Sequence, residues 1–541
     1  MPCPYQFSTP SQRHLLWPFV SVKAILYNII MATFDSLPPE LLILIQRMVD
    51  SPPDLHSLIT ASPACLRAFS LDRVRILSSV VVNGIQPGAL RHAVAIFHAP
   101  PPAETRPRQP LELFLDRYFS DTPLDLPTDT PDLATLCRLQ ALVSRFANEY
   151  FESAIRLLRT TKSSIPLSSY RRDDIAPLSH SELTRLQRAF FRHELYCRLF
   201  PVDQEWYSTR SFPTSDDQFR LFIARLEPWE VEEVNCVHDY LMRVSRHAVE
   251  DLEDRVVQAV LSFPGVQRPS ECRLSAPGSP KVVFKNQSEV MLARRCELGE
   301  NISTDPAPYE PTATNTGVSH RCHWSNEWWP ACCRERLLPF DDLEFWGLDI
   351  FEKTRRRSMA SDVSNLAALG LGAISRLVDG DGELRRNMIQ EHVSYPTHFL
   401  GEALRHSPSH HVDPDLLRIC GEGPGSDDPA QASVGYRLFR RPGRRLYDQI
   451  QGHVGDFAYN PLRERGYVFW DSARIEVGGA TVSLEEARDV PRETLNSMIW
   501  RRRMSVEERL EGVMMPGSVK ERITREFGYP KWFDSVPEGD E

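Results

Sequence analysis

The sequence of 541 residues lacks a long apolar run and a long block of one charge. Its most apolar stretch, residues 15–32, is interrupted by Pro18, Lys23 and Asn28. It is therefore too short and too broken to span a bilayer, and it lacks the clean core of a signal peptide. The net charge of -10 provides no positive footprint for nonspecific nucleic-acid binding. We expect neither a membrane nor a nucleic acid as a partner.

The cysteines lack the regular spacing of a disulfide framework. There are 11, an odd number scattered along the chain, which is typical of a reducing compartment. We therefore expect a cytoplasmic or nuclear protein. One cluster contains side chains that can bind zinc, but its spacing is not that of a finger or ribbon. We interpret its cysteines as packed or free, and predict no metal and no cofactor; the cluster is His320, Cys322, His323, Cys332 and Cys333.

Catalytic motifs and sequence repeats are also missing. The chain has neither a phosphate-binding glycine loop of the P-loop type nor a Gly-x-Ser-x-Gly elbow. No segment repeats at leucine-rich, WD or kelch spacing. Histidines and serines are present, but none lies in a motif that makes it a catalytic candidate. The sequence therefore predicts a protein that is not an enzyme.

The patterns that are present are mostly helical. Ser179-His180-Ser181-Glu182 matches a capping box before a helix over 183–200, and Pro228 begins another helix. Apolar spacing predicts one long helix or two over 133–158. With 41% hydrophobic residues most of the chain can fold around a core, while 43 prolines break it into short elements. We predict a mainly α fold, with a short N-terminal module followed by a large, irregular, all-helical body with long loops.

These patterns also divide the chain. Met31 stands just before the first helical module, so we expect translation to begin there, with a mitochondrial presequence as the lesser alternative. The expected parts are an extension over 1–33, a helical module over 34–80, a helical body over 81–262, a linker or long loop over 263–320, a helical C-terminal part with short aromatic segments over 321–490, and a charged helical tail over 491–541. The segment 466–475 is consistent with either a strand or a buried turn.

The N-terminal module has the clearest pattern. Pro38 suits the first position of a helix, and Glu40 in the first turn complements the positive end of the helix dipole. At 100° per residue one broad apolar arc forms, which must be buried against something. Ile43 falls outside that arc, on the side of Gln46 and Arg47. The arc contains Leu41, Leu42, Leu44, Ile45, Met48 and Val49.

Two short helices are expected to follow. Asp54 can cap a helix containing Leu55. Ser62 can cap the next one, with Pro63 in its first turn. Three or four such short helices cannot bury a large core alone, so they require the body, a partner or both.

The start Leu37-Pro38, the aliphatic helix after it and the pair Asp54-Leu55 resemble an F-box. In that family the module binds a Skp-type adaptor, which joins it to a cullin scaffold in a ubiquitin ligase. The resemblance implies that the chain is the substrate receptor of such a ligase and recruits an unknown protein substrate. Carried over residue by residue, it implies adaptor contacts at Leu37, Pro38, Leu41, Ile43 and Leu55.

A second interpretation remains open. The third helix begins Ser62-Pro63-Ala64, and no tryptophan lies between residues 37 and 80, unlike many F-boxes. In this interpretation the F-box-like segment is a packing element of a non-catalytic scaffold or protein-interaction protein. That alternative predicts that Leu37, Pro38 and Ile43 are buried against residues 85–260.

A broader resemblance covers the body. Three separate stretches are similar to a family of uncharacterised fungal F-box-like proteins, in which they follow a short N-terminal F-box. This resemblance implies one long architecture from about Phe34 to the C-terminal region, and no catalytic residue. The stretches are 183–197, 228–234 and 465–471.

Overall fold

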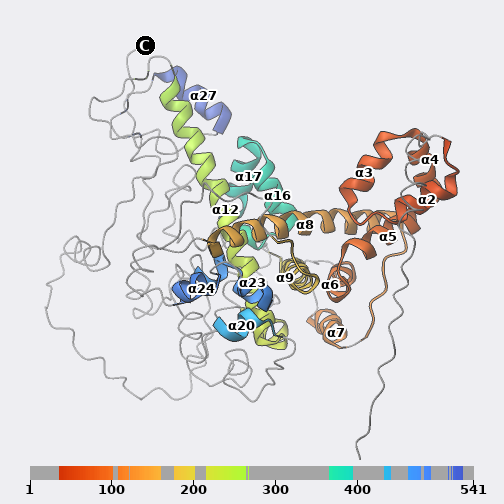
Figure 1. Ribbon diagram of the computed structural model, residues 1–541. Coiled ribbons are helices and arrows are strands. Elements are labelled where there is room, and N and C mark those ends of the chain that lie inside the picture. Colours follow the sequence, from red (N-terminus) through yellow and green to blue (C-terminus); the bar gives the residue numbers. More distant parts are fainter. Residues whose placement is uncertain are drawn as a thin grey trace, which may run out of the picture. The chain divides into compact units, whose positions relative to one another are not determined.

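The computed structural model describes a helical protein, and the described part of the chain contains no β-strand (Figure 1). The prediction of a mainly α fold is confirmed. The described residues are 36–100, 108–120, 122–159, 176–201, 215–263, 266, 365–393, 432–439, 461–476, 480–488, 510, 513 and 516–527. The predicted extension, almost all of the predicted linker and the possible zinc ligands lie outside these ranges.

The chain forms two compact units. The N-terminal unit comprises Met1–Gly84 and Thr128–Arg138, and the body unit comprises Ile85–Pro127 and Leu139–Glu541. One uninterrupted helix, α8 (Thr130–Arg159), contributes residues to both. The prediction over 133–158 was one long helix or two, and the structure has the single helix.

Four short helices make up most of the N-terminal unit. They are α2 (Pro39–Arg47), α3 (Pro52–Ala61), α4 (Pro63–Leu71) and α5 (Arg73–Gly84). The predicted boundary at residue 80 therefore falls inside α5. A small core joins α2 to α4 through Leu42, Ala64, Cys65 and Ala68.

The helix starts in this unit follow the sequence with small differences. Helix α2 begins at Pro39, and Pro38 is its N-cap rather than its first helical residue. The expected Asp54 cap is wrong, because the Ser51 hydroxyl accepts a hydrogen bond from the Asp54 amide at 3.4 Å. The expected Ser62 cap is confirmed: its hydroxyl accepts hydrogen bonds from the amides of Ala64 and Cys65.

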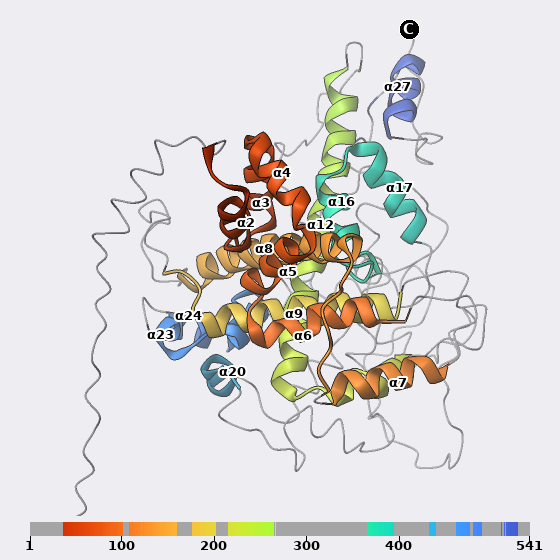
Figure 2. The same cartoon turned by 90° about the vertical axis from the view of Figure 1, so that its right-hand side faces the viewer.

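Three helices form the centre of the body unit. Helices α6 (Pro87–His98) and α9 (His180–Leu199) pack side by side, and α12 (Pro228–Ser262) packs against α9 (Figure 2). The predicted capping box is present at Ser179, whose side chain and that of Glu182 bond each other's backbone amides. The predicted start of α12 at Pro228 is confirmed. Nearby lie α7 (Arg108–Phe119), α11 (Ser215–Leu221) and η4 (Ile223–Arg225).

The long helix α12 serves two cores. At 35 residues it extends over about 50 Å, because an α-helix rises 1.5 Å per residue. Its first half packs against α9, and its second half contacts α16 (Leu371–Asp379), α17 (Gly382–Val393) and α27 (Gly517–Phe527), as Figure 1 shows. The apolar residues of this second core include Leu252, Val256, Leu377, Ile389 and Ile523.

The C-terminal part contributes short helices to the first core. They are α20 (Val434–Phe439), α22 (Pro461–Glu464), η6 (Tyr467–Phe469), α23 (Ser472–Ile475) and α24 (Ala480–Arg488). The segment 466–475, for which strand and buried turn were both open, is therefore helical and turn-like. Phe469 and Trp470 are both fully buried there.

Candidate functional site

One face of α2 is apolar and exposed. Leu41 is 46% exposed, Leu44 51% and Met48 74%. Positions separated by three, four and seven residues lie on one side of a helix, so these three side chains form a continuous stripe. We call Leu41, Leu44 and Met48 the α2 face.

The opposite side of α2 packs into the N-terminal unit. Leu42 and Gln46 are buried there, and Ile43 packs against the core that joins α2 to α4. The Gln46 side-chain amide donates a hydrogen bond to the Cys65 carbonyl at 2.8 Å. The predicted arc is therefore buried only along one edge, at Leu42. A polar residue that finds a hydrogen-bond partner can be buried, which helical periodicity alone does not reveal.

The structure separates the five predicted contact residues. Pro38 and Leu41 are exposed, and Leu37 and Ile43 are half-buried against the unit's own core. Leu55 is only 3% exposed, so its side chain is the buried side chain of α3 and not a surface contact. The contacts carried over from the F-box resemblance do not include Leu44 and Met48, although both lie in the predicted apolar arc.

Exposed large apolar side chains are concentrated in the N-terminal unit. Seven of the eleven in the described part of the chain lie between residues 41 and 82. Apolar surface of this kind marks an interaction site more often when it is grouped than when it is scattered. The seven are Leu41, Leu44, Met48, Leu66, Leu71, Val74 and Val82; the other four are Leu113, Leu384, Leu438 and Val482.

The body unit brings together the three stretches quoted for the fungal resemblance. Arg188 in 183–197 pairs with Glu233 in 228–234 at 2.6 Å, and Arg185 pairs with Asp471 in 465–471 at 2.5 Å. Helices α9, α12 and η6 contact one another in this core. Segments almost 300 residues apart in the sequence therefore share one buried polar core.

Arg463 holds the centre of that core. Its guanidinium donates two hydrogen bonds to Glu232, at 2.8 and 2.9 Å, and one to Asp239 at 3.2 Å. All three side chains are almost fully buried. Burial by itself would lower the pKa of Arg463, but the two carboxylates raise it well above its ordinary value. The pairing gives the buried guanidinium a carboxylate partner on both sides and joins α22 to α12.

A second ionic contact joins the C-terminal segment 461–475, which contains Arg463, to the start of α9. Arg474 donates two hydrogen bonds to Glu182, at 2.6 and 2.8 Å. Ser179 donates to Asp471 at 2.6 Å, and Ser181 and Arg185 donate to the same carboxylate. Partial burial raises the pKa of Asp471, but these hydrogen bonds outweigh it and lower the pKa below its usual range.

Among the described residues, buried His193, His238 and Cys197 lie close together but do not form a reactive arrangement. His193 stacks on His238 with ring centroids 5.7 Å apart, and its Nδ1 lies 3.6 Å from the Cys197 sulfur. Burial lowers the pKa of His193 to about 3 and raises that of the Cys197 thiol. A buried neutral thiol is a poor nucleophile. No cluster of three or more His, Cys, Asp or Glu residues suited to a metal occurs in the part of the chain that the structure describes.

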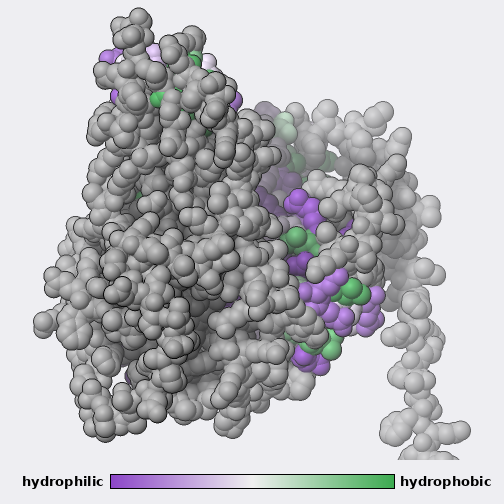
Figure 3. Space-filling view, turned by 90° about the vertical axis from the view of Figure 1, so that its left-hand side faces the viewer, coloured by the Kyte–Doolittle hydropathy of each residue, from purple (hydrophilic) through white to green (hydrophobic). Residues whose placement is uncertain are grey.

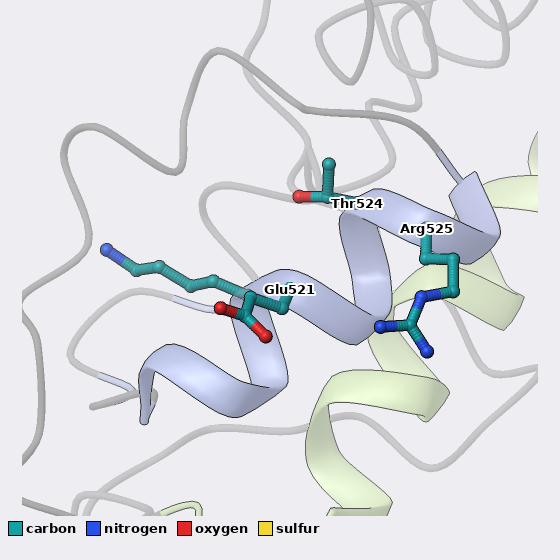
Figure 4. A pocket seen from close by; sticks show the side chains of 4 residues that line it. Glu521, Thr524 and Arg525 are labelled. Carbon is teal, nitrogen blue, oxygen red and sulfur yellow. The ribbon is translucent and has the colours of Figure 1, made fainter.

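An open cavity in the described part of the chain is a weaker candidate. A cavity of about 440 Å³ lies against α27, lined by Lys520, Glu521, Thr524 and Arg525. Figure 4 shows that the labelled side chains leave this one helix in different directions. On the face drawn in Figure 3, hydrophobic and hydrophilic described residues are interspersed. The α2 face is therefore the strongest candidate site.

Comparisons with known proteins give no relative. No protein-family model, curated protein or solved structure matches the chain. Among the described helices, none is both long enough and apolar enough to cross a membrane. The F-box resemblance therefore stays a prediction that rests on the residues of α2 and α3.

Proposed function

We propose that the chain is a non-catalytic substrate receptor of a ubiquitin ligase of the Skp–cullin–F-box type. In this proposal the α2 face binds the Skp-type adaptor, and through it the cullin scaffold. The body recruits a protein substrate, and other subunits catalyse the transfer of ubiquitin.

The exposure of the α2 face is the observation that carries the proposal. A lone amphipathic helix normally buries its apolar side, but α2 buries Leu42 and Gln46 and leaves Leu41, Leu44 and Met48 in solvent. Anchors at this spacing are how a helix fits into the apolar groove of a partner. Leu37-Pro38, where the F-box resemblance begins, directly precedes this helix.

The scaffold alternative makes a different prediction for the same helix. It requires Leu37, Pro38 and Ile43 to be buried against residues 85–260. In the structure Pro38 is exposed, and Leu37 and Ile43 pack against the core of their own unit, formed by Leu42, Ala64, Cys65 and Ala68. The packing of these two residues is therefore explained without the body.

Capture of a purified Skp-type adaptor tests the proposal. We expect the wild-type chain to bind, and both Leu37→Ala/Pro38→Ala and Leu44→Asp/Met48→Asp to lose at least tenfold in affinity. Leu113→Asp is the matched control, because Leu113 is 62% exposed on α7 of the body unit. Circular dichroism checks that each variant is folded. Equal, negligible capture by the wild type and all variants would overturn the proposal.

A further inference from the structure

Three charged side chains join α12 to the C-terminal segment 461–475, and their charges do not cancel. Two are carboxylates, Glu232 and Asp239, and one is the guanidinium of Arg463. Glu232 and Asp239 lie seven residues apart, on the same side of α12, and both face Arg463 of α22. Glu232 takes two of the three hydrogen bonds that Arg463 donates to these carboxylates. Two carboxylates therefore share one guanidinium in a site from which water is excluded.

Asp239 is the weaker partner in this cluster. Its Oδ2 accepts from Arg463 at 3.2 Å, while no donor among the described residues reaches its Oδ1. The side chain is 0% exposed. A buried carboxylate with so few hydrogen bonds is costly to keep charged.

The other groups that act on Asp239 do not fully compensate this cost. Arg243, one turn further along α12, favours the charged form, but it also lies 3.8 Å from Glu464. The elements packed around the cluster contribute neutral groups. They are Cys236 on α12, Tyr150 on α8, which donates to the Arg463 carbonyl, and Tyr467 on η6.

We propose that Asp239 is a proton-operated latch for the segment 461–475: uptake of one proton by its carboxyl group strengthens the hold of α12 on that segment. Protonation removes the surplus negative charge. Arg463 stays paired with Glu232, so the segment remains in place. When the segment leaves, Asp239 is exposed to water and regains its ordinary acidity.

The direction of the effect follows from linkage. Burial raises the pKa of Asp239 to about 6 from an ordinary value of 3.8, although Arg463 and Arg243 oppose the rise. The closed state therefore binds the proton more tightly than the open state, and the segment opens more readily as pH rises toward 6 and above. Between pH 5.5 and 7.5 we expect an increase of about fourfold in the opening constant.

Hydrogen exchange of the full chain measures this opening locally. The Phe469 and Gly435 amides are suitable probes, because they donate to the Gly466 and Trp470 carbonyls. After correction for the intrinsic rise of exchange with pH, we expect their protection to fall about fourfold from pH 5.5 to 7.5. Amides of α6, away from the segment, serve as the internal reference.

Two variants make the assignment specific. Asp239→Asn cannot ionise, so most of the fall in protection of Phe469 should disappear. Glu464→Gln removes a carboxyl group of the segment itself, whose pKa burial also raises, and should retain most of the fall. If Asp239→Asn does not fold, the infrared carbonyl stretch of protonated carboxyl groups follows the titration in the wild type and Glu464→Gln. Protection in the wild type that is independent of pH, or that rises with pH, would overturn the latch.

Discussion

The Tyr150 hydroxyl, on α8, donates a hydrogen bond of 2.6 Å to the backbone carbonyl of Arg463, 313 residues later in the chain. The Tyr150 ring also meets Phe469 edge-on, with centroids 5.7 Å apart. One helix of the body unit therefore holds both the backbone and an aromatic side chain of the C-terminal segment. This contact orients Arg463 toward the carboxylates of α12.

Removal of Arg463 should destabilise the body unit strongly. Arg463→Met leaves Glu232 and Asp239 buried without the guanidinium that they share, and loss of one partner of a buried pair costs about 3–5 kcal/mol. Arg255→Ala is the control, because Arg255 pairs with Asp251 at 2.9 Å with both side chains about half exposed. That change should alter the free energy of unfolding by at most about 1 kcal/mol. Urea unfolding of both variants measures the difference, and similar losses would contradict the expectation.

Two glycines of the body unit should respond in opposite directions to alanine. Gly466 has a φ of 62°, and an added Cβ would lie 2.6 Å from Trp470. Gly466→Ala should therefore lower the free energy of unfolding by about 1–3 kcal/mol. Gly372 lies in α16 with open space around it, so Gly372→Ala should raise the free energy by up to about 1 kcal/mol. Thermal unfolding checks the two signs, and a loss from Gly372→Ala would show that the space is not free.

Neighbouring leucines of α2 should behave differently. Leu42 is 2% exposed, so Leu42→Ala removes core packing and should cost about 2–4 kcal/mol. Leu44 is 51% exposed, and Leu44→Ala should change stability by less than about 0.5 kcal/mol. Hydrogen exchange of α2 and α4 reports the stability of the N-terminal unit. Equal effects of the two changes would mean that Leu44 is covered in solution.

His193 should make the body unit sensitive to acid. Burial lowers its pKa from 6.5 to about 3, so the unfolded chain takes up a proton between these values and the folded chain does not. The stabilisation by neutral His193 is complete above pH 6.5 and is lost as pH falls toward 3. From pH 7 to 5 the loss is about 2 kcal/mol.

Comparison with a variant isolates this contribution, because Asp239 acts in the opposite direction over the same range. His193→Leu removes the titrating group and places an apolar side chain at this buried position. The stability of the variant should fall less from pH 7 to 5 than that of the wild type, by about 2 kcal/mol. Urea unfolding measures the free energy of unfolding at each pH. Parallel pH profiles for the wild type and the variant would contradict this expectation.

Local helix signals were readable from the sequence. The Ser62 and Ser179 caps, the start at Pro228 and the helix over 133–158 all follow from rules that act within a few residues. The sequence did not show which side of α2 is buried, because the apolar arc of this helix is wider than the strip that contacts α4. Only packing shows that Leu42 and Gln46 face inward and Leu44 faces solvent.

The sequence by itself determined the helical class, the starts of α4, α9 and α12 and the apolar character of α2, because these depend on neighbours along the chain. The tertiary structure decided which charges meet. In the sequence, three acids look like ordinary surface residues of their helices: Glu182, Glu232 and Asp239. They are buried because they pair with Arg463 and Arg474, which lie far away in the chain. Such pairings depend on contacts across hundreds of residues, and helical periodicity carries no information about them.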